Sequence, residues 1–419
     1  MIVPSPARAA ATPTDRFFHA DHLARRRSIA PRRLEVAAEL GPDVHRGLVG
    51  LVADTSAVSC VDPDSNTLLL RGYPIAQLAE HCDFLDTVAL LWTGELPAPG
   101  EHAVFSARER ALRRIDSRLE TLIRSMSRAC HPTDVLRTAI SWLGADDPHQ
   151  GFRSPTAERE KALGLLAALP TIVASDIRRR RGLEPIAPDS QLSYTENMLY
   201  MSFGEVPEPA IVHAFEVAMV LYADHGFSAS TFATRVTTST LSDLYSAIVA
   251  GISTLKGPLH GGANEAVMAM ITDIDGPDNV EPWLARMLAE RRTIMGFGHR
   301  VYKRRDCRVA PLRAQLEKVA TLRDGSDLLA TYQVLVSAML REKGLYPNLD
   351  YVAGPLFHLI GFDREVFTSL FAMSRVAGWT AHILEQRASN TLIRPLATYT
   401  GPPRREVPTF RSHLSATRG

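Results

Sequence analysis

Three short segments of the chain combine glycine, histidine, arginine and aspartate in ways that suit acid–base chemistry. The first runs from Lys256 to Glu265 and has His260 beside two glycines, so backbone or a ligand can approach closely. Asn264 is a suitable N-cap for the apolar pattern that follows, which places His260 just before a helix N-terminus. The helix dipole disfavours imidazolium there, and a neutral histidine can donate to a carbonyl that becomes an enolate. A turn histidine bonded only to backbone is the alternative.

The second segment runs from Met295 to Arg308 and again places a histidine, His299, after a glycine-bracketed turn. Such a turn is followed here by five cations within nine residues: Arg300, Lys303, Arg304, Arg305 and Arg308. A cluster of this kind suits phosphates or carboxylates, although a solvated basic surface has the same composition.

The third segment, Tyr346 to Tyr351, holds Asp350 among apolar neighbours. Partial burial would raise the pKa of this carboxyl toward the range of a general base, and a capping or turn aspartate is the alternative. Together the segments supply two histidines, a carboxylate and many arginines, which suits proton abstraction next to a carbonyl group. The spacing alone leaves open whether the three segments converge.

Helices must position these segments, because apolar residues recur with a helical period from Pro74 onward. The pattern predicts a helix from Phe84 that ends at Gly94, and further helices over 101–129, 135–143, 157–180, 192–203, 208–223, 240–255, 264–274, 280–292, 309–322, 326–343 and 363–389. The one convincing β signal is at Leu48–Val52 and Thr67–Leu70, which flank a turn at Asp62–Asn66 and predict a small hairpin. The predicted fold class is therefore all-α.

Composition excludes several classes of protein. The 419 residues have a formal charge of +1, which argues against a nucleic-acid binder that relies on bulk charge. The longest apolar stretch, Leu163 to Ala174, is too short for a membrane helix, which needs about 20 residues. There is no P-loop, GxGxxG, HExxH or GxSxG motif, and no ligand spacing suggests a metal.

Cysteine usage and the N-terminus bear on location. The four cysteines are well separated, which fits a reducing compartment, and we expect a cytoplasmic protein. Residues 1–45 are rich in proline and arginine, lack a sustained apolar period, and lack the apolar core of a secretory signal. They are predicted to form a mobile tail.

The strings GPLHGGANEAVM, MGFGHRVYKRRDCR and PNLD, in that order, resemble the three catalytic stretches of the citrate synthase family. The resemblance runs from about residue 47 to about residue 411, and LYADHGFSAST, SRVAGWTAH and LIRP make it finest to the 2-methylcitrate synthases within that family. It implies a two-domain helical homodimer, with residues 1–45 as the tail, 46–257 and 364–419 as a large domain, and 258–363 as a small domain.

The resemblance also implies a role for particular residues. His260 would donate to the acyl-CoA thioester carbonyl, His299 would polarise the oxaloacetate carbonyl, and Asp350 would abstract the α-proton. Further substrate contacts are expected from Arg71, His225, Arg308, Arg375 and, across the subunit interface, Arg394. A coenzyme A loop is expected at Thr293, Ile294, Met295, Gly296 and Phe297, with Lys303 near the CoA phosphates. Cys307 stands where the family usually has proline, and we do not expect it to be a nucleophile.

The activity implied is condensation of propionyl-CoA with oxaloacetate and water to give 2-methylcitrate and CoA, with acetyl-CoA as a second substrate. Coenzyme A thioester is then a substrate, and no cofactor or metal is expected. Two alternatives stay open: a dedicated citrate synthase, and a non-catalytic helical regulator of the same fold. The simultaneous presence of His260, His299 and Asp350 argues against the regulator.

Overall fold

A computed structural model of the chain describes residues 44–62, 65–299, 301–302 and 305–406. Ser56–Arg394 form one compact unit, and the described residues outside it, 44–55 and 395–406, belong to another. In the second unit the described part contains one short 3-10 helix, η2 (Arg46–Leu48). The tail predicted at 1–45 lies almost wholly outside the described residues.

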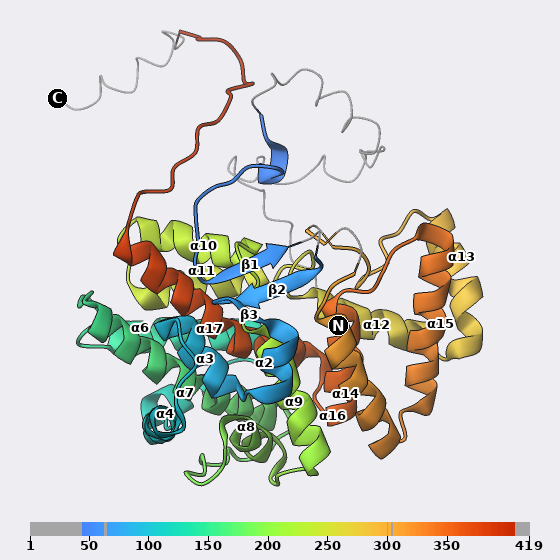
Figure 1. Ribbon diagram of the computed structural model, residues 1–419, viewed down its shortest axis with the longest axis horizontal. Coiled ribbons are helices and arrows are strands. Elements are labelled where there is room, and N and C mark those ends of the chain that lie inside the picture. The colour runs from blue at the N-terminus through green and yellow to red at the C-terminus, as the bar shows by residue number, and fades with distance from the viewer. Residues whose placement is uncertain (1–43, 63–64, 300, 303–304, 407–419) are drawn as a thin grey trace, which may run out of the picture. The chain divides into compact units, whose positions relative to one another are not determined.

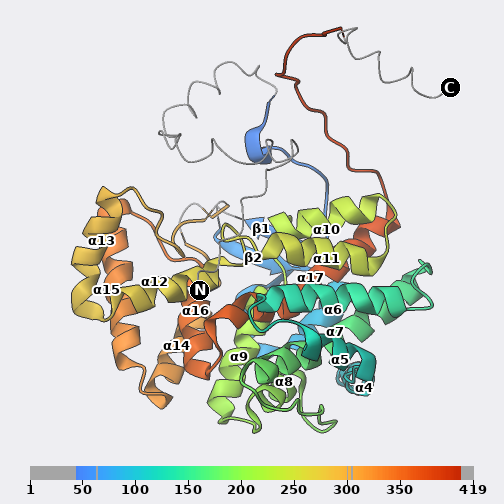
Figure 2. The same ribbon diagram turned by 180° about the vertical axis from the view of Figure 1, so that it is seen from behind.

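The larger unit is mainly helical, as the sequence predicts (Figures 1 and 2). Its first elements are β1 (Ser59–Asp62), β2 (Thr67–Leu70), β3 (Tyr73–Pro74), α2 (Ile75–His81), α3 (Phe84–Thr93), α4 (Pro99–Ala111), α5 (Ser117–Ser125), α6 (Pro132–Asp146), α7 (Pro155–Arg180), α8 (Tyr194–Phe203), α9 (Pro209–Tyr222), α10 (Ala229–Ser239) and α11 (Leu244–Leu255). The remainder are α12 (Ala263–Ile274), η3 (Pro277–Asn279), α13 (Val280–Ala289), α14 (Val309–Leu322), α15 (Ser326–Lys343), α16 (Leu349–Ile360), η4 (Arg364–Val366) and α17 (Phe367–Ala388). None of the described helices is long and apolar enough to span a bilayer.

The small sheet is antiparallel in the order β1-β2-β3, with Ser59 opposite Leu70. The predicted hairpin turn is in place, but the prediction of a strand at Leu48–Val52 is wrong. β2 pairs instead with the residues directly before the turn, as expected for a tight hairpin. Leu48 and Val52 are exposed, so no buried face selects a strand there.

Helix prediction succeeds where the apolar period is regular or a glycine ends the helix. α14 and α15 have the predicted bounds, and Gly94 ends α3 in the left-handed conformation. The single helix predicted at 101–129 is wrong, because the Asp116 side chain accepts from the N–H of Leu119 and starts a new helix, α5. α10 and α16 are additional helices that the pattern did not indicate.

α17 lies at the centre of the larger unit and is buried along most of its length. It packs against α3, α7, α9, α10 and α11. Helices α12 to α16 gather at one end of this unit, on the right in Figure 1 and on the left in Figure 2. This grouping supports a small domain over 258–363, and the division into large and small domains stays a prediction.

The carboxyl group of Glu216 on α9 accepts from the main-chain N–H of Phe84 at 2.5 Å and from the Thr195 hydroxyl. Burial raises its pKa to about 7, and the carboxylate of Asp83 adds to the effect. The folded state therefore binds more protons than the unfolded state from about pH 4.5 to pH 7. Stability contributed by this group falls as pH rises through that window.

We expect Glu216→Gln to change the melting temperature little at pH 5 and to raise it relative to wild type at pH 8, because glutamine cannot ionise. Differential scanning fluorimetry at both pH values measures this. Glu80→Gln, at an exposed side chain on α2, is the control and should give the same small change at both. Parallel wild-type and Glu216→Gln curves would contradict the prediction.

Candidate active site

His260 lies in the turn between α11 and α12, where its ring is partly buried. The main-chain N–H of Ser230 donates to its Nε2 at 3.2 Å, and the Ser230 hydroxyl oxygen is 2.7 Å from the same atom. Because an N–H can only donate, Nε2 is the acceptor, and the neutral ring carries its proton on Nδ1. The indole N–H of Trp379 donates to the Ser230 hydroxyl at 3.2 Å, which leaves the hydroxyl proton for His260.

The charge state of His260 follows from the same surroundings. Burial and the nearby Arg375 guanidinium lower the pKa of His260 to about 4, so the ring is neutral at pH 7. A neutral imidazole with a proton on Nδ1 is a hydrogen-bond donor suited to a developing enolate oxygen. The neutral ring that the sequence predicts is therefore confirmed, and burial is the largest cause of the lowered pKa.

The chain around His260 is held at both ends by the first turn of α6. Lys256 Nζ lies 2.7 Å from the Asp134 carboxylate, and the Glu265 carboxylate lies 3.0 Å from His131 Nε2. Glu265 also accepts from the main-chain N–H of Thr368 at 3.1 Å. These contacts fix the glycine-rich turn against α6 and α17.

The prediction that Asn264 caps the following helix is wrong. α12 begins at Ala263, with Gly262 as its N-cap, and Asn264 lies inside the first turn. The turn before α12 is tight, since a Cβ on Gly261 would approach Leu255 Cγ to 2.5 Å. The Asn264 side chain is fully buried instead.

His299 lies in the loop between α13 and α14. The main-chain N–H groups of Val301 and Tyr302 donate to its Nδ1 at 3.0 and 3.2 Å. Nδ1 is therefore the acceptor, and the proton of the neutral ring is on Nε2. Burial and the Arg308 guanidinium lower the pKa of His299 to about 4. A second neutral imidazole donor results, of the opposite tautomer.

Asp350 is the second residue of α16, and its main-chain N–H donates to the capping side chain of Asn348 at 3.1 Å. Its own carboxylate does not cap the helix; Oδ1 accepts from the Tyr222 hydroxyl at 2.7 Å. Burial raises the pKa of Asp350 to about 6, against opposing effects of Tyr222 and Arg308. The predicted upward shift is confirmed, and the group is suited to act as a general base near neutral pH.

The second and third segments are joined by main-chain hydrogen bonds. The N–H of Asn348 donates to the Gly296 carbonyl at 2.9 Å, and the N–H of Gly298 donates to the Tyr346 carbonyl at 2.9 Å. Gly296 has a positive φ, and a Cβ there would approach Tyr351 Cβ to 2.8 Å, so only glycine fits. The loop with His299 is therefore held directly against the start of the helix with Asp350.

Asp306 is a site residue that the sequence reasoning missed. Its buried carboxylate accepts from Arg308 Nε at 2.9 Å and Nη2 at 2.8 Å, and from the main-chain N–H of Leu349 at 3.2 Å. One carboxylate thus orients the arginine and the first turn of the helix that carries Asp350. The signal was present in the string Asp306-Cys307-Arg308, because an Asp two residues before a buried Arg can pair with it.

Arg375 on α17 is fully buried and stays charged at neutral pH, since burial lowers its pKa only to about 10. Its Nε donates to the Tyr222 carbonyl at 2.7 Å, and its Nη1 donates to the Ser228 hydroxyl at 3.2 Å. Tyr222 binds Asp350 through its hydroxyl, and Ser228 lies two residues before Ser230, which binds His260. Arg375 therefore lies between the first and third segments and connects them.

His225 is buried, with its ring centre 5.1 Å from that of His299 and its Nε2 3.3 Å from the Tyr302 hydroxyl. Burial, with the charge of Arg308 nearby, lowers its pKa well below the usual range. The structure thus brings His225, His299 and Arg308 together, as the resemblance implies.

A buried polar chain fixes the backbone on either side of His225. His382 Nε2 lies 3.3 Å from Asp224 Oδ1, and Asp224 Oδ2 accepts from the N–H of Gly226 at 3.0 Å. Arg235 Nη1 donates to His382 Nδ1 at 3.1 Å, so the His382 proton is on the nitrogen that faces Asp224. These residues were not singled out from the sequence, where nothing marks them as partners.

The remaining predicted site residues have other surroundings in the structure. Arg71 donates to the main-chain carbonyls of Ala57 and Leu91, which is a structural use of its guanidinium. Arg394 is exposed after the end of α17.

In the expected coenzyme A loop, Thr293 is exposed, while Ile294 and Gly296 are buried and Met295 and Phe297 are partly buried. Lys303 lies outside the described residues, as do Arg300 and Arg304; Arg305 is exposed, with its guanidinium 4.9 Å from the ring centre of Tyr346.

Cys307 is partly buried, and its Sγ lies 3.3 Å from the Tyr302 hydroxyl. Burial raises the pKa of this thiol above its usual value, which lowers its reactivity as a nucleophile. The expectation that Cys307 is not a nucleophile agrees with this environment. All four cysteines of the chain are free.

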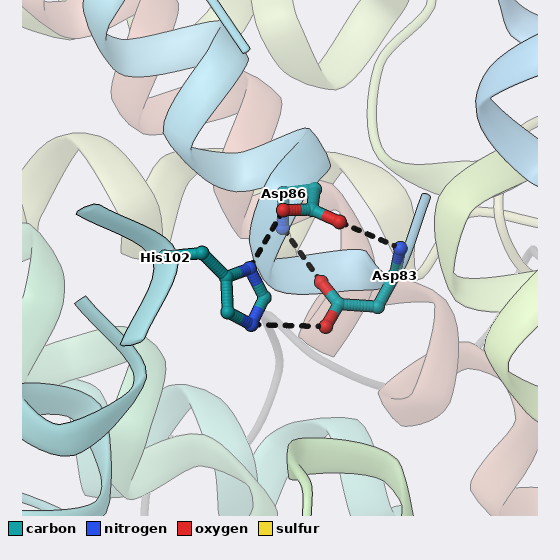
Figure 3. A group of neighbouring side chains, drawn as sticks. All are labelled: Asp83, Asp86 and His102. Atoms are coloured by element: carbon teal, nitrogen blue, oxygen red, sulfur yellow. Dashed lines mark hydrogen bonds and ion pairs between the residues drawn. The ribbon is translucent and has the colours of Figure 1, made fainter. Parts of the chain in front are cut away.

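Among the described residues, one group has metal-ligand side chains within 4.8 Å of one another, namely Asp83, Asp86 and His102 (Figure 3). Figure 3 shows that they already satisfy each other. The two aspartates form the capping box of α3, and His102 contacts Asp86 at 2.6 Å and Asp83 at 3.3 Å. The group is explained as a helix cap and carries no further argument for a metal.

The fold and these segments define the class of protein. Residues 47–396 match the family model described as "Citrate synthase, C-terminal domain", and the chain belongs to the citrate synthase family.

Individual members of the citrate synthase family show where the similarity is high. A 2-methylcitrate synthase of Mycobacterium tuberculosis is 53% identical over 388 residues, which are 92% of this chain and 98% of that protein. A citrate synthase of Mycolicibacterium smegmatis is also 53% identical, over 87% of this chain and 97% of that protein. 2-Methylcitrate synthase 2 of Corynebacterium glutamicum is 48% identical over 87% of this chain and 97% of that protein.

Solved structures agree on the fold. Citrate synthase from Thermotoga maritima superposes with a TM-score of 0.79 at 37% identity, covering 88% of this chain and 99% of that one. A ternary complex of citrate synthase from Thermoplasma acidophilum with carboxymethyl coenzyme A and oxaloacetate superposes with a TM-score of 0.84 at 30% identity, with the same coverage. The predicted all-α, citrate synthase-like fold with a small N-terminal β element is confirmed.

Proposed function

We propose that this chain condenses propionyl-CoA with oxaloacetate and water to give 2-methylcitrate and CoA, and that it also uses acetyl-CoA. The observation that carries the proposal is the convergence of a neutral Nδ1–H donor, His260, with a base of raised pKa, Asp350, around Arg375. The curated 2-methylcitrate synthases that the chain resembles support the choice of propionyl-CoA.

In the proposed first step, Asp350 removes the α-proton of the acyl thioester while His260 donates its Nδ1–H to the thioester oxygen. An α-proton is far less acidic than a carboxylic acid, so the developing enolate must be stabilised where its charge appears. The hydrogen bonds from Ser230 to Nε2 hold His260 in the required tautomer before the substrate arrives. Burial raises the pKa of Asp350, which makes it a stronger base than an exposed carboxylate.

In the proposed second step, the enolate carbon attacks the ketone carbon of oxaloacetate, and the ketone oxygen takes the proton from Nε2 of His299 and becomes a hydroxyl group. Arg308 and Arg375 hold the carboxylates by charge-assisted hydrogen bonds, together with His225. Fixed orientation of two reactants lowers the entropic cost of bringing them together. Hydrolysis of the resulting thioester then releases CoA. This chemistry uses proton transfer and hydrogen bonding, with CoA thioester as a substrate.

The proposal extends to assembly, to coenzyme A binding and to location. Arg394 is exposed in a single chain, which supports its contribution to a neighbouring subunit's site in a homodimer. Thr293 to Phe297, with Lys303, would bind coenzyme A beside the loop that carries His299. Arg71 would assist substrate binding through the small sheet. Cysteines that are all free support a reducing, cytoplasmic location.

A dedicated citrate synthase is the second candidate, because the M. smegmatis citrate synthase and the M. tuberculosis 2-methylcitrate synthase are both 53% identical to this chain. The substrates differ by one methylene, and a hydrophobic pocket discriminates such a difference by about 10–200-fold. We expect kcat/KM for propionyl-CoA to be at least comparable with that for acetyl-CoA, measured by thiol release on one preparation. A propionyl-CoA value more than about a hundredfold below the acetyl-CoA value would favour the citrate synthase.

A non-catalytic regulator is separated from both enzymes by the same assay. A regulator releases no thiol from either acyl-CoA in the presence of oxaloacetate. Either enzyme releases it from at least one.

A further inference from the structure

The carboxylate of Asp350 accepts a hydrogen bond from the side chain of a buried tyrosine, Tyr222. Tyr222 is the last residue of α9, it is fully buried, and its hydroxyl donates to Asp350 Oδ1 at 2.7 Å. The ring is held between Phe371, at 4.0 Å between ring centres, and Phe357, at 6.3 Å. A ring fixed in this way has little freedom to carry its hydroxyl elsewhere.

The main chain of the same residue holds a second part of the site. The Tyr222 carbonyl accepts from Arg375 Nε at 2.7 Å, and the Arg375 guanidinium lies 4.7 Å from the ring centre of Phe371. One residue therefore contacts the base through its side chain and the substrate arginine through its backbone. Tyr222 therefore links Asp350 to Arg375 through its own side chain and main chain.

Asn264 closes the other side of the hydroxyl. Its side chain is fully buried, and among the described residues neither amide atom has a hydrogen-bond partner. The amide lies near enough to the Tyr222 hydroxyl to influence it, although outside hydrogen-bond geometry. α12 and α16 meet here closely, since a Cβ on Gly354 would approach the Asn264 carbonyl oxygen to 2.8 Å. The acceptor of the Tyr222 hydroxyl is identified by its distance, which is 2.7 Å to Asp350 Oδ1.

We propose that Tyr222 is a positioning residue for the base: its hydroxyl binds Oδ1 of Asp350 and leaves Oδ2 for the α-proton of the acyl-CoA. This inference rests on the function proposed above. Tyr222 touches neither reacting carbon in this account; it fixes the carboxylate in one orientation and favours its ionised form.

Loss of the Tyr222 hydroxyl should shift the pKa of Asp350 upward, and a purely structural role of Tyr222 would not produce this shift. A hydrogen bond donated to a carboxylate favours the charged form, so loss of the hydroxyl raises the pKa of Asp350 above about 6. Asp350 must be ionised to act, so the acid limb of the pH–rate profile moves to higher pH. At high pH the base is ionised in both proteins, and the difference in rate narrows.

The test compares kcat/KM for thiol release between pH 5 and pH 9 in wild type and Tyr222→Phe, which keeps the ring and the main-chain carbonyl. We expect the midpoint of the acid limb to rise by about one pH unit, with a high-pH plateau within about fivefold of wild type. Tyr351→Phe is the matched control. That tyrosine is equally buried and adjoins Asp350 in sequence, but its hydroxyl donates to the Tyr332 carbonyl at 3.1 Å. Its acid limb should not move.

An unchanged acid limb in Tyr222→Phe, whether or not the plateau falls, would overturn the proposal. The ¹³C carboxyl resonance of Asp350, assigned by its loss in Asp350→Asn, provides a readout that does not need turnover. Its titration midpoint should rise in Tyr222→Phe, and an unchanged midpoint would likewise overturn the proposal. Wild type that releases no thiol from either acyl-CoA would count against the proposed function alone, and the carboxyl titration would still decide the role of Tyr222.

Discussion

Replacing Asp350 by asparagine is expected to lower kcat/KM for thiol release by about 10²–10⁴-fold, the usual contribution of a general base. The amide cannot take a proton from the substrate at neutral pH. Asparagine keeps an oxygen that can accept from Tyr222 and a main-chain N–H that donates to Asn348, so the fold should be retained. The measurement is steady-state kinetics with oxaloacetate and either acyl-CoA.

Asp363→Asn is the control for this variant. Asp363 follows α16, is exposed, and pairs with Arg181 at 2.9 Å away from the site. Its kinetics should match those of wild type. Activity above about a tenth of wild type in Asp350→Asn would show that this carboxylate is not the base.

Loss of Arg394 should be nearly as severe, because truncating one partner of a buried, hydrogen-bonded charge pair costs 2–5 kcal/mol or more, which is roughly 30-fold to several-thousandfold in affinity. We expect Arg394→Ala to be almost inactive even though the residue is exposed in a single chain. A KM for oxaloacetate that rises far more than the KM for acyl-CoA would place the loss at the carboxylates.

Subunit mixing tests whether Arg394 acts across an interface. A hybrid of Arg394→Ala and His260→Ala chains would contain one site with both residues and one with neither. Roughly a quarter of the wild-type rate should return after exchange at equal amounts, because half the dimers are mixed and one of their two sites is complete. Two inactive proteins that stay inactive after proven exchange would show that Arg394 serves its own chain or has no role.

The types of residue in the site, the neutral state of His260 and the raised pKa of Asp350 could be predicted from the sequence, but the tautomers of the two histidines could not. Nothing in the string around His260 indicates that Ser230, thirty residues earlier, donates to Nε2 and sets the tautomer. The tautomer of His299 depends on the path of its own backbone, which turns two N–H groups toward Nδ1. Such details follow from tertiary packing and not from residue type.

The fold shows the same division between local and distant causes. α14 and α15 were predictable because their apolar residues recur with a regular helical period, and Gly344 ends α15 in the left-handed conformation. α10 was missed because its serine and threonine residues have low helix propensity, and burial against α11 and α17 stabilises it. The pattern does not predict α16 because Pro355, which disfavours a helix interior, lies inside it.

Buried polar side chains show where helix-capping rules fail. Asn264 follows a glycine pair and precedes an apolar pattern, which is the usual setting of an N-cap. The N-cap is instead Gly262, two residues earlier, so Asn264 lies in the first turn of α12 and its amide is buried. A polar residue displaced from a capping position in this way marks a site where other constraints dominate.

The most direct test of the account is the reaction of wild-type protein with propionyl-CoA and oxaloacetate, followed by thiol release and by chromatographic identification of the acid formed. We expect one thiol to be released for each 2-methylcitrate formed, and neither product when oxaloacetate is omitted. Citrate and thiol should form in the same ratio from acetyl-CoA. Absence of thiol release with both acyl-CoAs, from protein shown to be folded, would contradict the assignment of His260, His299 and Asp350 as a condensing site.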